Sequence, residues 1–191
     1  MKRIHTIALA GAAALALGFG AAATVPTYAK DMTKMVGDAP MYPSKNIVQN
    51  AIHSKDHTTL VAAVKAAGLV KTLESPGPFT VFAPTNEAFA KLPDGTVQNL
   101  LKPENKKTLT AVLTYHVVPG RLTTSALMKK VKAGHGTAEL KTVEGKPLTI
   151  KEKDGHLWII DGKGDKARIT VSNVMQSNGV IQVINTVLLP G

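Results

Sequence analysis

The sequence predicts a single-domain α+β protein with a helical first half and a β second half. Apolar side chains recur with helical spacing as far as Gly136 and then alternate or run continuously, as they do in strands. Asp-Gly and Asn-Gly pairs separate the apolar runs of the second half, and such pairs tolerate the positive φ of tight hairpin turns. The length of 191 residues suits one domain, and the absence of cysteine excludes disulfides and thiolate chemistry.

Residues 1–29 have the pattern of a secretory signal peptide. Two cations precede the apolar run Ile7–Ala23, and small residues that suit cleavage end at Ala29. A membrane anchor that stays in place is the rival interpretation, but the run is rich in Ala and Gly and spans a bilayer once at most. We expect an exported protein, periplasmic or extracellular. Residues 30–45 are expected to form an irregular leader, because Gly and Pro interrupt them without a clear period.

Several short helices are predicted in the first half, each from an N-cap residue followed by apolar side chains at helical spacing. They are expected from Asn46 to His53, capped by Ser44 or Asn46; over Thr58–Ala67, capped by Asp56 and ended by Gly68; after Thr85; near Val97–Leu101; over Pro103–Tyr115; and from Thr123 through Met128. A strand is expected over Phe79–Ala83, since this β-branched and aromatic run lies between the turn Ser75–Pro78 and Pro84.

The second half is predicted to be an antiparallel meander. Its strands are expected at Leu140–Val143, Leu148–Lys151, Leu157–Ile160, Ile169–Val174 and Val180–Leu189. Tight turns are expected at Glu144-Gly145, Asp154-Gly155, Asp161-Gly162 and Asn178-Gly179.

No arrangement of residues indicates an enzyme. The sequence lacks a Gly-x-Ser-x-Gly nucleophile turn, a phosphate-binding glycine loop and a dinucleotide motif. His53 and His57 have metal-ligand spacing only if one helix carries both, and a helix break is expected between them. Asp154, Asp161 and Asp165 raise the question of calcium, but their spacing is not that of a calcium loop, and turn formation explains them better. We expect no catalysis, no metal and no cofactor.

The chain is basic, with a formal net charge of +10 that becomes +8 once the predicted signal is removed. The cations are nearly all lysine, whereas proteins that read nucleic acids favour arginine and interleave aromatic side chains. We therefore expect no nucleic-acid partner and at most peripheral contact with membranes. Solvated lysine-rich faces are the simplest interpretation, and attraction to anionic surfaces or to an anionic polysaccharide is the functional one.

Three segments together resemble the fasciclin domain family. They are Phe79–Phe89 (FTVFAPTNEAF) with Leu92-Pro93, Leu113–Gly120 (LTYHVVPG) and Asn178–Pro190 (NGVIQVINTVLLP). Their order and spacing match the family, and the resemblance covers residues 46–190. It implies a wedge of two mostly antiparallel β-sheets packed with several helices. It also implies a non-enzymatic role in cell adhesion, or in association with a surface or an extracellular matrix.

The motif residues fall into a structural set and a partner-binding set. Residues expected to build the core, caps and turns are Phe79, Thr80, Phe82, Pro84, Phe89, Asn178, Gly179 and Pro190. Residues expected to face a partner are Thr85, Asn86, Tyr115, His116, Asn173 and Val174. For Tyr115 and His116 a buried polar latch is the alternative, because buried polar side chains need hydrogen-bond partners.

The sequence departs from the family at two places. Gln182 and Asn185 stand where the family usually carries His and Asp, and Asn173-Val174 stands where animal members carry an Asp-Ile or Asp-Val pair linked to integrin binding. A partner's divalent cation prefers a carboxylate, and Asn offers only a neutral amide. We therefore expect a surface protein or an anionic polysaccharide as the partner in place of an integrin, with the chain a monomer or weak oligomer.

A carrier of a small apolar ligand, such as a carotenoid, is the alternative function. Some fasciclin-like proteins bind carotenoids, and a wedge of two sheets could open an apolar cleft. The walls of such a cleft are expected to include Leu127, Met128, Trp158 and Met175.

Overall fold

Two strands from distant parts of the chain, β3 (Phe79–Pro84) and β9 (Gly179–Ile184), lie side by side and parallel within one seven-stranded sheet. The computed structural model describes residues 33–191, so the predicted signal at residues 1–29 lies outside the described residues. The strand order is β4-β3-β9-β8-β7-β6-β5. The remaining strands of this sheet are β4 (Val117–Pro119), β5 (Thr137–Lys141), β6 (Pro147–Lys153), β7 (His156–Ile160) and β8 (Lys166–Gln176).

The predicted antiparallel meander is confirmed. Each strand from β5 to β9 pairs antiparallel with the next one along the chain. β8 belongs to two halves of the sheet, because its first residues pair with β7 and its later residues pair with β9. Shifts of register between Ile169 and Val171 and between Val171 and Val174 interrupt its pairing with β9, and such bulges bend a strand. The expected two-sheet wedge is therefore formed by two halves of one sheet that share β8.

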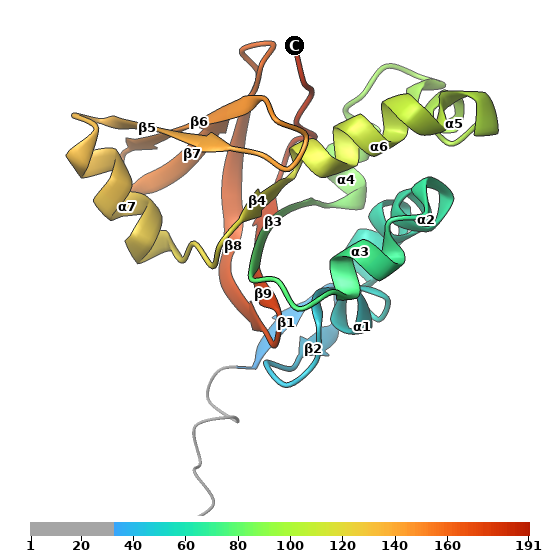
Figure 1. Ribbon diagram of the computed structural model, residues 1–191, viewed down its shortest axis with the longest axis horizontal. Helices are drawn as coiled ribbons and strands as arrows, with labels where there is room; N and C mark the ends of the chain where they lie inside the picture. Colours follow the sequence, from blue (N-terminus) through green and yellow to red (C-terminus); the bar gives the residue numbers. More distant parts are fainter. Residues whose placement is uncertain (1–32) are drawn as a thin grey trace, which may run out of the picture.

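Seven α-helices pack on this sheet within residues 33–191. They are α1 (Ile47–Ala51), α2 (Thr58–Ala67), α3 (Val70–Glu74), α4 (Asn86–Ala90), α5 (Thr96–Leu100), α6 (Lys106–Tyr115) and α7 (Thr124–Ala133), with 3₁₀ turns η2 (Lys55–His57) and η3 (Pro103–Asn105). In Figure 1, α1–α6 lie on one side of the β3–β9 pair, and α7 lies with β5–β7 on the other. None of the helices in this described range has the length and hydrophobicity to cross a membrane.

Two hydrophobic clusters lie on opposite faces of the β3–β9 pair. Val81 and Ala83 point into the cluster that includes residues of α1–α4 and α6, whereas Phe82 between them points into the cluster with α7. β9 alternates in the same way, with Val183 in the first cluster and Ile184 in the second. Successive side chains of a strand point to opposite faces, so a strand with both faces buried serves two cores at once.

The prediction of an irregular leader over residues 30–45 is wrong for much of that segment. β1 (Lys34–Val36) and β2 (Ala39–Met41) form a hairpin, and Gly37 and Asp38 both have the positive φ of a tight two-residue turn. Val36 and Met41 are buried in the cluster with α1–α4 and α6. The hairpin was not predicted because three-residue strands are too short to show alternation. Pro40 also argued against a strand, since proline is rare within strands.

Helix boundaries agree with the predictions at most caps. Asn46 caps α1 in a reciprocal pair with Gln49, and Thr85 and Thr123 cap α4 and α7 through their side-chain oxygens. Gly68 ends α2 at a φ of 75°, as expected for a left-handed position. α7 is longer than predicted, since it continues five residues beyond Met128 to Ala133.

The turn before β9 lies one residue earlier than predicted. Ser177 and Asn178 form the turn, and Gly179 already pairs with Phe79 as the first residue of β9. Gly179 is required for close approach: a Cβ atom at this position would lie 2.1 Å from the carbonyl oxygen of Phe79. This glycine therefore allows the parallel pair to begin.

The hairpin offers a matched pair of methionines for a stability test. Met41 is 2% exposed and Met35 is 61% exposed. We expect Met41→Ala to lower the free energy of unfolding by about 3 kcal/mol, because it removes buried contacts and leaves a cavity. Met35→Ala is expected to change it by less than about 0.5 kcal/mol. Urea unfolding of both variants measures the two effects. Equal effects would contradict the packing of the hairpin into the core through Met41.

Candidate functional site

An apolar cavity of about 100 Å³ lies between the helical layer and the sheet. Its walls come from the β1–β2 hairpin, α1, α2, α3, β3, β9 and the end of α6. The side chains that line it are mainly aliphatic; they include Met41, Ile47, Leu60, Val64, Leu73, Val81, Leu113, Val174 and Ile181. Apolar cavities of this order stay dry and accept small apolar molecules; one of about 150 Å³ binds benzene.

Two histidines belong to the cavity lining, His57 and His116. Burial lowers the pKa of His116 to about 4, against the opposing effects of the Val112 carbonyl and the Asp161 carboxylate. Burial also lowers the pKa of His57, while the Ala83 carbonyl and the Asp56 carboxylate act in the other direction. Both imidazoles are therefore neutral at pH 7, which suits an apolar lining.

The walls predicted for an apolar cleft lie elsewhere. None of Leu127, Met128, Trp158 and Met175 is among the residues that line this cavity. Leu127 and Met128 instead pack in the cluster with α7, on the opposite face of the β3–β9 pair. The actual lining comes from short helices, the β1–β2 hairpin and the strands β3 and β9, whose apolar residues carry only the general pattern of a core, so the sequence did not distinguish a cavity there.

Tyr115 and His116 join the end of α6 to two distant segments. The Tyr115 hydroxyl donates to the Pro147 carbonyl at 2.8 Å. His116 Nδ1 lies 2.7 Å from the Val112 carbonyl oxygen, and its Nε2 accepts from the Leu188 N–H at 3.0 Å. Because a carbonyl can only accept, the proton sits on Nδ1. This is the geometry of the buried polar latch, and contact of the pair with a partner stays a prediction.

Asn173 and Val174 lie in the bent part of β8. Asn173 has a φ of 54°, which Asn tolerates better than most residues. Its side chain accepts from the Thr124 N–H at 2.8 Å and donates to the Thr124 hydroxyl at 2.8 Å, and its own N–H donates to the Gln182 side chain at 2.9 Å. Val174 is buried. Gln182, where the family usually has His, thus helps to fix the bulge and to hold it against the start of α7.

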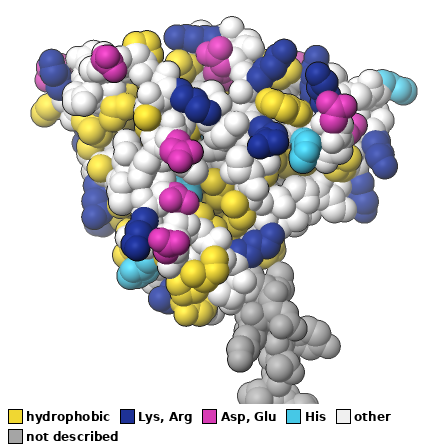
Figure 2. Space-filling view, turned by 180° about the vertical axis from the view of Figure 1, so that it is seen from behind, with side chains coloured by type: hydrophobic (Ala, Val, Ile, Leu, Met, Phe, Trp, Pro, Cys, Tyr) yellow, Lys and Arg dark blue, Asp and Glu magenta, His cyan; other side chains and the backbone are white. Residues whose placement is uncertain are grey.

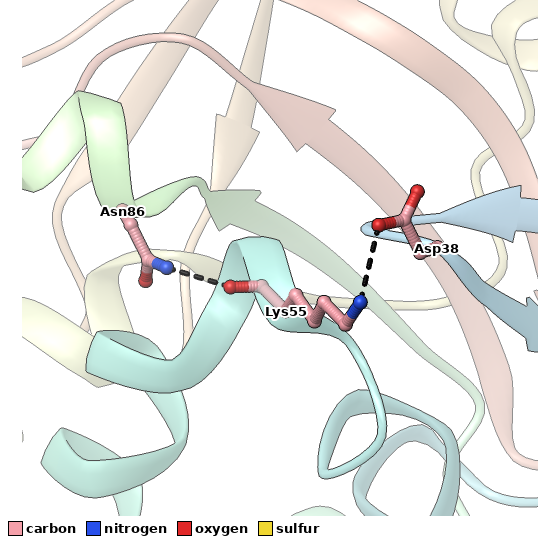
Figure 3. A network of polar contacts seen from close by, with 3 residues as sticks. All are labelled: Asp38, Lys55 and Asn86. Atoms are coloured by element: carbon pink, nitrogen blue, oxygen red, sulfur yellow. Dashed lines mark hydrogen bonds and ion pairs between the residues drawn. The ribbon is translucent and has the colours of Figure 1, made fainter.

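Asn86 stabilises the start of a helix that is far away in sequence. Its Oδ1 accepts from the Thr59 N–H at 3.0 Å. Its Nδ2 donates to the Lys55 carbonyl at 2.7 Å, as Figure 3 shows. The predicted cap Asp56 is wrong: His57 occupies the N-cap position of α2 without a side-chain hydrogen bond. Asn86 supplies the missing acceptor, so this residue locks α4 to α2.

Asn178 fastens β9 to the helical layer. Its Oδ1 accepts from the Ile47 N–H at 3.1 Å, and its Nδ2 donates to the carbonyls of Leu73 and Ser75 at 2.7 and 3.0 Å. Three backbone groups from α1 and from the end of α3 are thereby satisfied by one side chain.

The turn interpretation of the acidic residues is confirmed at Asp161. Its Oδ1 accepts from the N–H groups of Lys163 and Asp165, and its Oδ2 accepts from the Leu189 N–H at 2.8 Å. In the described range 33–191, no three His, Asp or Glu side chains lie together as metal ligands would.

The structure does not unite the six predicted partner-binding residues in one site. Within residues 33–191, no hydrogen bond links the Thr85–Asn86, Tyr115–His116 and Asn173–Val174 pairs to each other, and each pair joins different segments of the fold. Asn50 of α1 and Gln176 of β8, which were not predicted as functional or structural residues, hydrogen-bond to each other and join these two elements. Both side chains are buried, and the sequence does not show this burial.

Comparison with known proteins identifies the family. The model of the fasciclin domain matches residues 55–190, and the chain belongs to this family. Protein sll1483 of Synechocystis sp. strain PCC 6803 is 44% identical over 184 residues, which cover 96% of this chain and 95% of that protein. Immunogenic protein MPB70 of Mycobacterium bovis is 34% identical over 145 residues, covering 73% of this chain and 66% of the other.

A solved structure shares the fold. The FAS1 domain pair of the insect cell adhesion molecule Fasciclin I superposes with a TM-score of 0.68 at 21% sequence identity, covering 78% of this chain and 52% of that one. This likeness concerns the fold alone. The wedge of β-sheet and packed helices expected from the resemblance is therefore confirmed, both by the family match and by this structure.

His116 predicts a pH dependence of stability. Its pKa in the folded state, about 4, lies below the ordinary value of 6.5. Between these values the unfolded chain binds a proton that the folded chain does not, so the free energy of unfolding falls as the pH falls. We expect His116 to contribute a loss of about 2 kcal/mol from pH 7 to pH 4.5. Urea unfolding at several pH values measures it.

The control is another histidine. His156→Gln, at an exposed position, serves as this control, whereas His116→Gln should reduce the slope between pH 6.5 and pH 4.5 and leave the part that comes from His57. Equal slopes in the two variants would contradict the assignment of a neutral, buried His116.

Proposed function

Because the chain is a fasciclin domain protein, we propose that it is an exported, non-enzymatic interaction module that mediates cell adhesion or association with an extracellular surface. One structural observation carries the proposal. The polar residues of the family motifs are occupied by hydrogen bonds within the chain, so binding is left to the surface, where the cations are largely unpaired. The single ion pair of residues 33–191 joins Lys55 and Asp38, both exposed, at 3.4 Å.

One comparison is in keeping with this proposal. The structural neighbour is described as a cell adhesion molecule. The charge supports it as well: Figure 2 shows Lys and Arg side chains spread over the face seen there, with acidic side chains between them. A net positive chain with unpaired lysines is attracted to anionic surfaces, and salt weakens that attraction. The predicted signal at residues 1–29 supports export.

The test is attachment of the native host's cells to a surface. We expect deletion of the gene to reduce attachment, and the complete gene to restore it. A gene that lacks the codons for residues 1–29 should not restore attachment, since a protein that is not exported cannot reach the surface. Attachment counts in flow chambers measure the effect. Unchanged attachment after deletion would remove the proposed role.

The cavity supports carriage of a small apolar ligand as a second candidate function, but a whole carotenoid would not fit in it. Its volume of about 100 Å³ suits a ring-sized group more than a large molecule, and its two histidines are neutral at pH 7. The surrounding apolar side chains offer shape and dryness but few polar groups for orientation.

Filling the cavity tests this second function. Ala51 lines the cavity at the end of α1, and Ala66 lies exposed on α2. We expect saturating benzene to raise the melting temperature of the native chain and of Ala66→Leu, but not of Ala51→Leu, in which the added side chain occupies the space. Melting curves with and without benzene give the answer. If benzene does not raise the melting temperature of the native chain, the cavity is not a binding site for small apolar ligands, and the carrier function is contradicted.

A further inference from the structure

One face of the sheet half made of β5, β6, β7 and the start of β8 has no part in either hydrophobic cluster. Its inward side chains, among them Ile150 and Ile159, are buried beneath α7. The alternate residues point outward and are exposed or half-buried. Trp158 and Ile160 lie on this outer face and belong to neither hydrophobic cluster. In Figure 2, where this end of the molecule is turned to the right, Lys and Arg side chains lie among acidic and hydrophobic ones.

The register of the strands places the single tryptophan of the chain between two cations. Trp158 is directly opposite Lys151 on β6 and directly opposite Arg168 on β8. Neighbouring strands are about 4.8 Å apart, so the three side chains form one row across the outer face. The adjacent row contains Ile160 opposite Lys166. An aromatic ring is thus flanked by a positive charge on each side.

These cations have no partner in the described chain. Neither Lys151 nor Arg168 forms an ion pair, and the Arg168 guanidinium makes no hydrogen bond within residues 33–191. The backbone of Arg168 is nevertheless fixed, because its N–H donates to Asn185 Oδ1 at 2.8 Å. The one cation–π contact of the described range is Lys45 over Tyr42, so no cation covers the Trp158 ring.

The charge of the whole face is one-sided. Its outward cations are Lys141, Lys151, Lys153, Lys166 and Arg168, whereas Glu139 is its outward acid. Unpaired like charges on a rigid sheet repel one another, and an anionic ligand relieves that repulsion. An arginine with free donors is also suited to bind a carboxylate with two parallel hydrogen bonds.

We propose that this face, centred on Trp158 between Lys151 and Arg168, binds an anionic polysaccharide built from uronic-acid sugars. Trp158 stacks against the face of one sugar ring, and the two cations pair with carboxylates of the sugars on either side. The inference deepens the proposed function, on which it rests, by naming the class of partner and the surface that meets it.

The other anionic macromolecules fit this face less well. Single-stranded nucleic acids are bound by several aromatic side chains on which successive bases stack, and this face has one. A membrane surface requires a broad apolar area beside its cations, and Trp158 and Ile160 alone do not provide it.

The tryptophan itself reports on binding. Because the chain contains one Trp, its fluorescence measures this site alone. We expect short alginate chains, which are uronic-acid polymers, to change the emission of the mature protein and to bind more weakly as NaCl is raised. Dextran, which has rings without charge, and poly-glutamate, which has charge without rings, are expected to bind at least about tenfold more weakly.

Charge-matched variants locate the site, with affinity measured by calorimetry. Lys151→Gln with Arg168→Gln should lower the affinity for alginate about tenfold or more. Lys106→Gln with Lys107→Gln removes the same charge from exposed residues of α6 and should change it less than about twofold. Trp158→Leu should lower alginate binding about tenfold while leaving the weak binding of poly-glutamate unchanged. Thermal melts of each variant establish that it is folded.

Three results would overturn the inference: equal losses in the two double variants, unchanged alginate affinity in Trp158→Leu, or binding of phosphatidylglycerol vesicles or single-stranded DNA at this face in place of alginate. The experiments distinguish failure of this inference from failure of the proposed function. If gene deletion reduces attachment but alginate does not bind, the adhesion role stands with another partner. If alginate binds at Trp158 but deletion leaves attachment unchanged, the site stands and the adhesion role falls.

Discussion

The parallel pairing of β3 with β9 is the interaction on which the other parts of this fold depend. The two strands pair over six residues, from Phe79 with Gly179 to Pro84 with Ile184. They are separated by about a hundred residues, so their pairing joins the helical first half to the meander. Side chains on one face of the pair complete the core beneath α1–α4 and α6, and those on the other complete the core beneath α7. Gly179 permits the approach, and Asn178 ties its start to the helices.

The polar residues of the family motifs largely stabilise the packing of the helices on the sheet. Asn86, His116, Asn173 and Asn178 each use their side chains to satisfy backbone groups of distant segments, where an unpaired buried group would be costly. Side chains whose hydrogen-bonding groups are already occupied within the chain are poorly suited to bind a partner. Two features remain: an apolar cavity, whose lining includes residues of all three motifs, and a cationic outer sheet face around Trp158, which lies outside them.

Local signals in the sequence predicted the elements well. Thr85, Thr123 and Gly68 mark helix ends through their own backbone preferences, and the alternation after Gly136 predicts the meander. Long-range relations were not predictable in the same way. The cap of α2 comes from Asn86, which is 27 residues away from Thr59, and the β1–β2 hairpin is too short to show a period. The row formed by Lys151, Trp158 and Arg168 exists only once the strand register is known.

We infer that the motifs build the fold and that the outer face of β5–β8 meets the partner. Backbone hydrogen exchange of the mature protein, with and without alginate, tests this claim residue by residue. We expect added protection in β6, β7 and the first residues of β8, and none at Tyr115–His116 or Asn173–Val174. Protection concentrated at those motif pairs, with β6 and β7 unchanged, would contradict it.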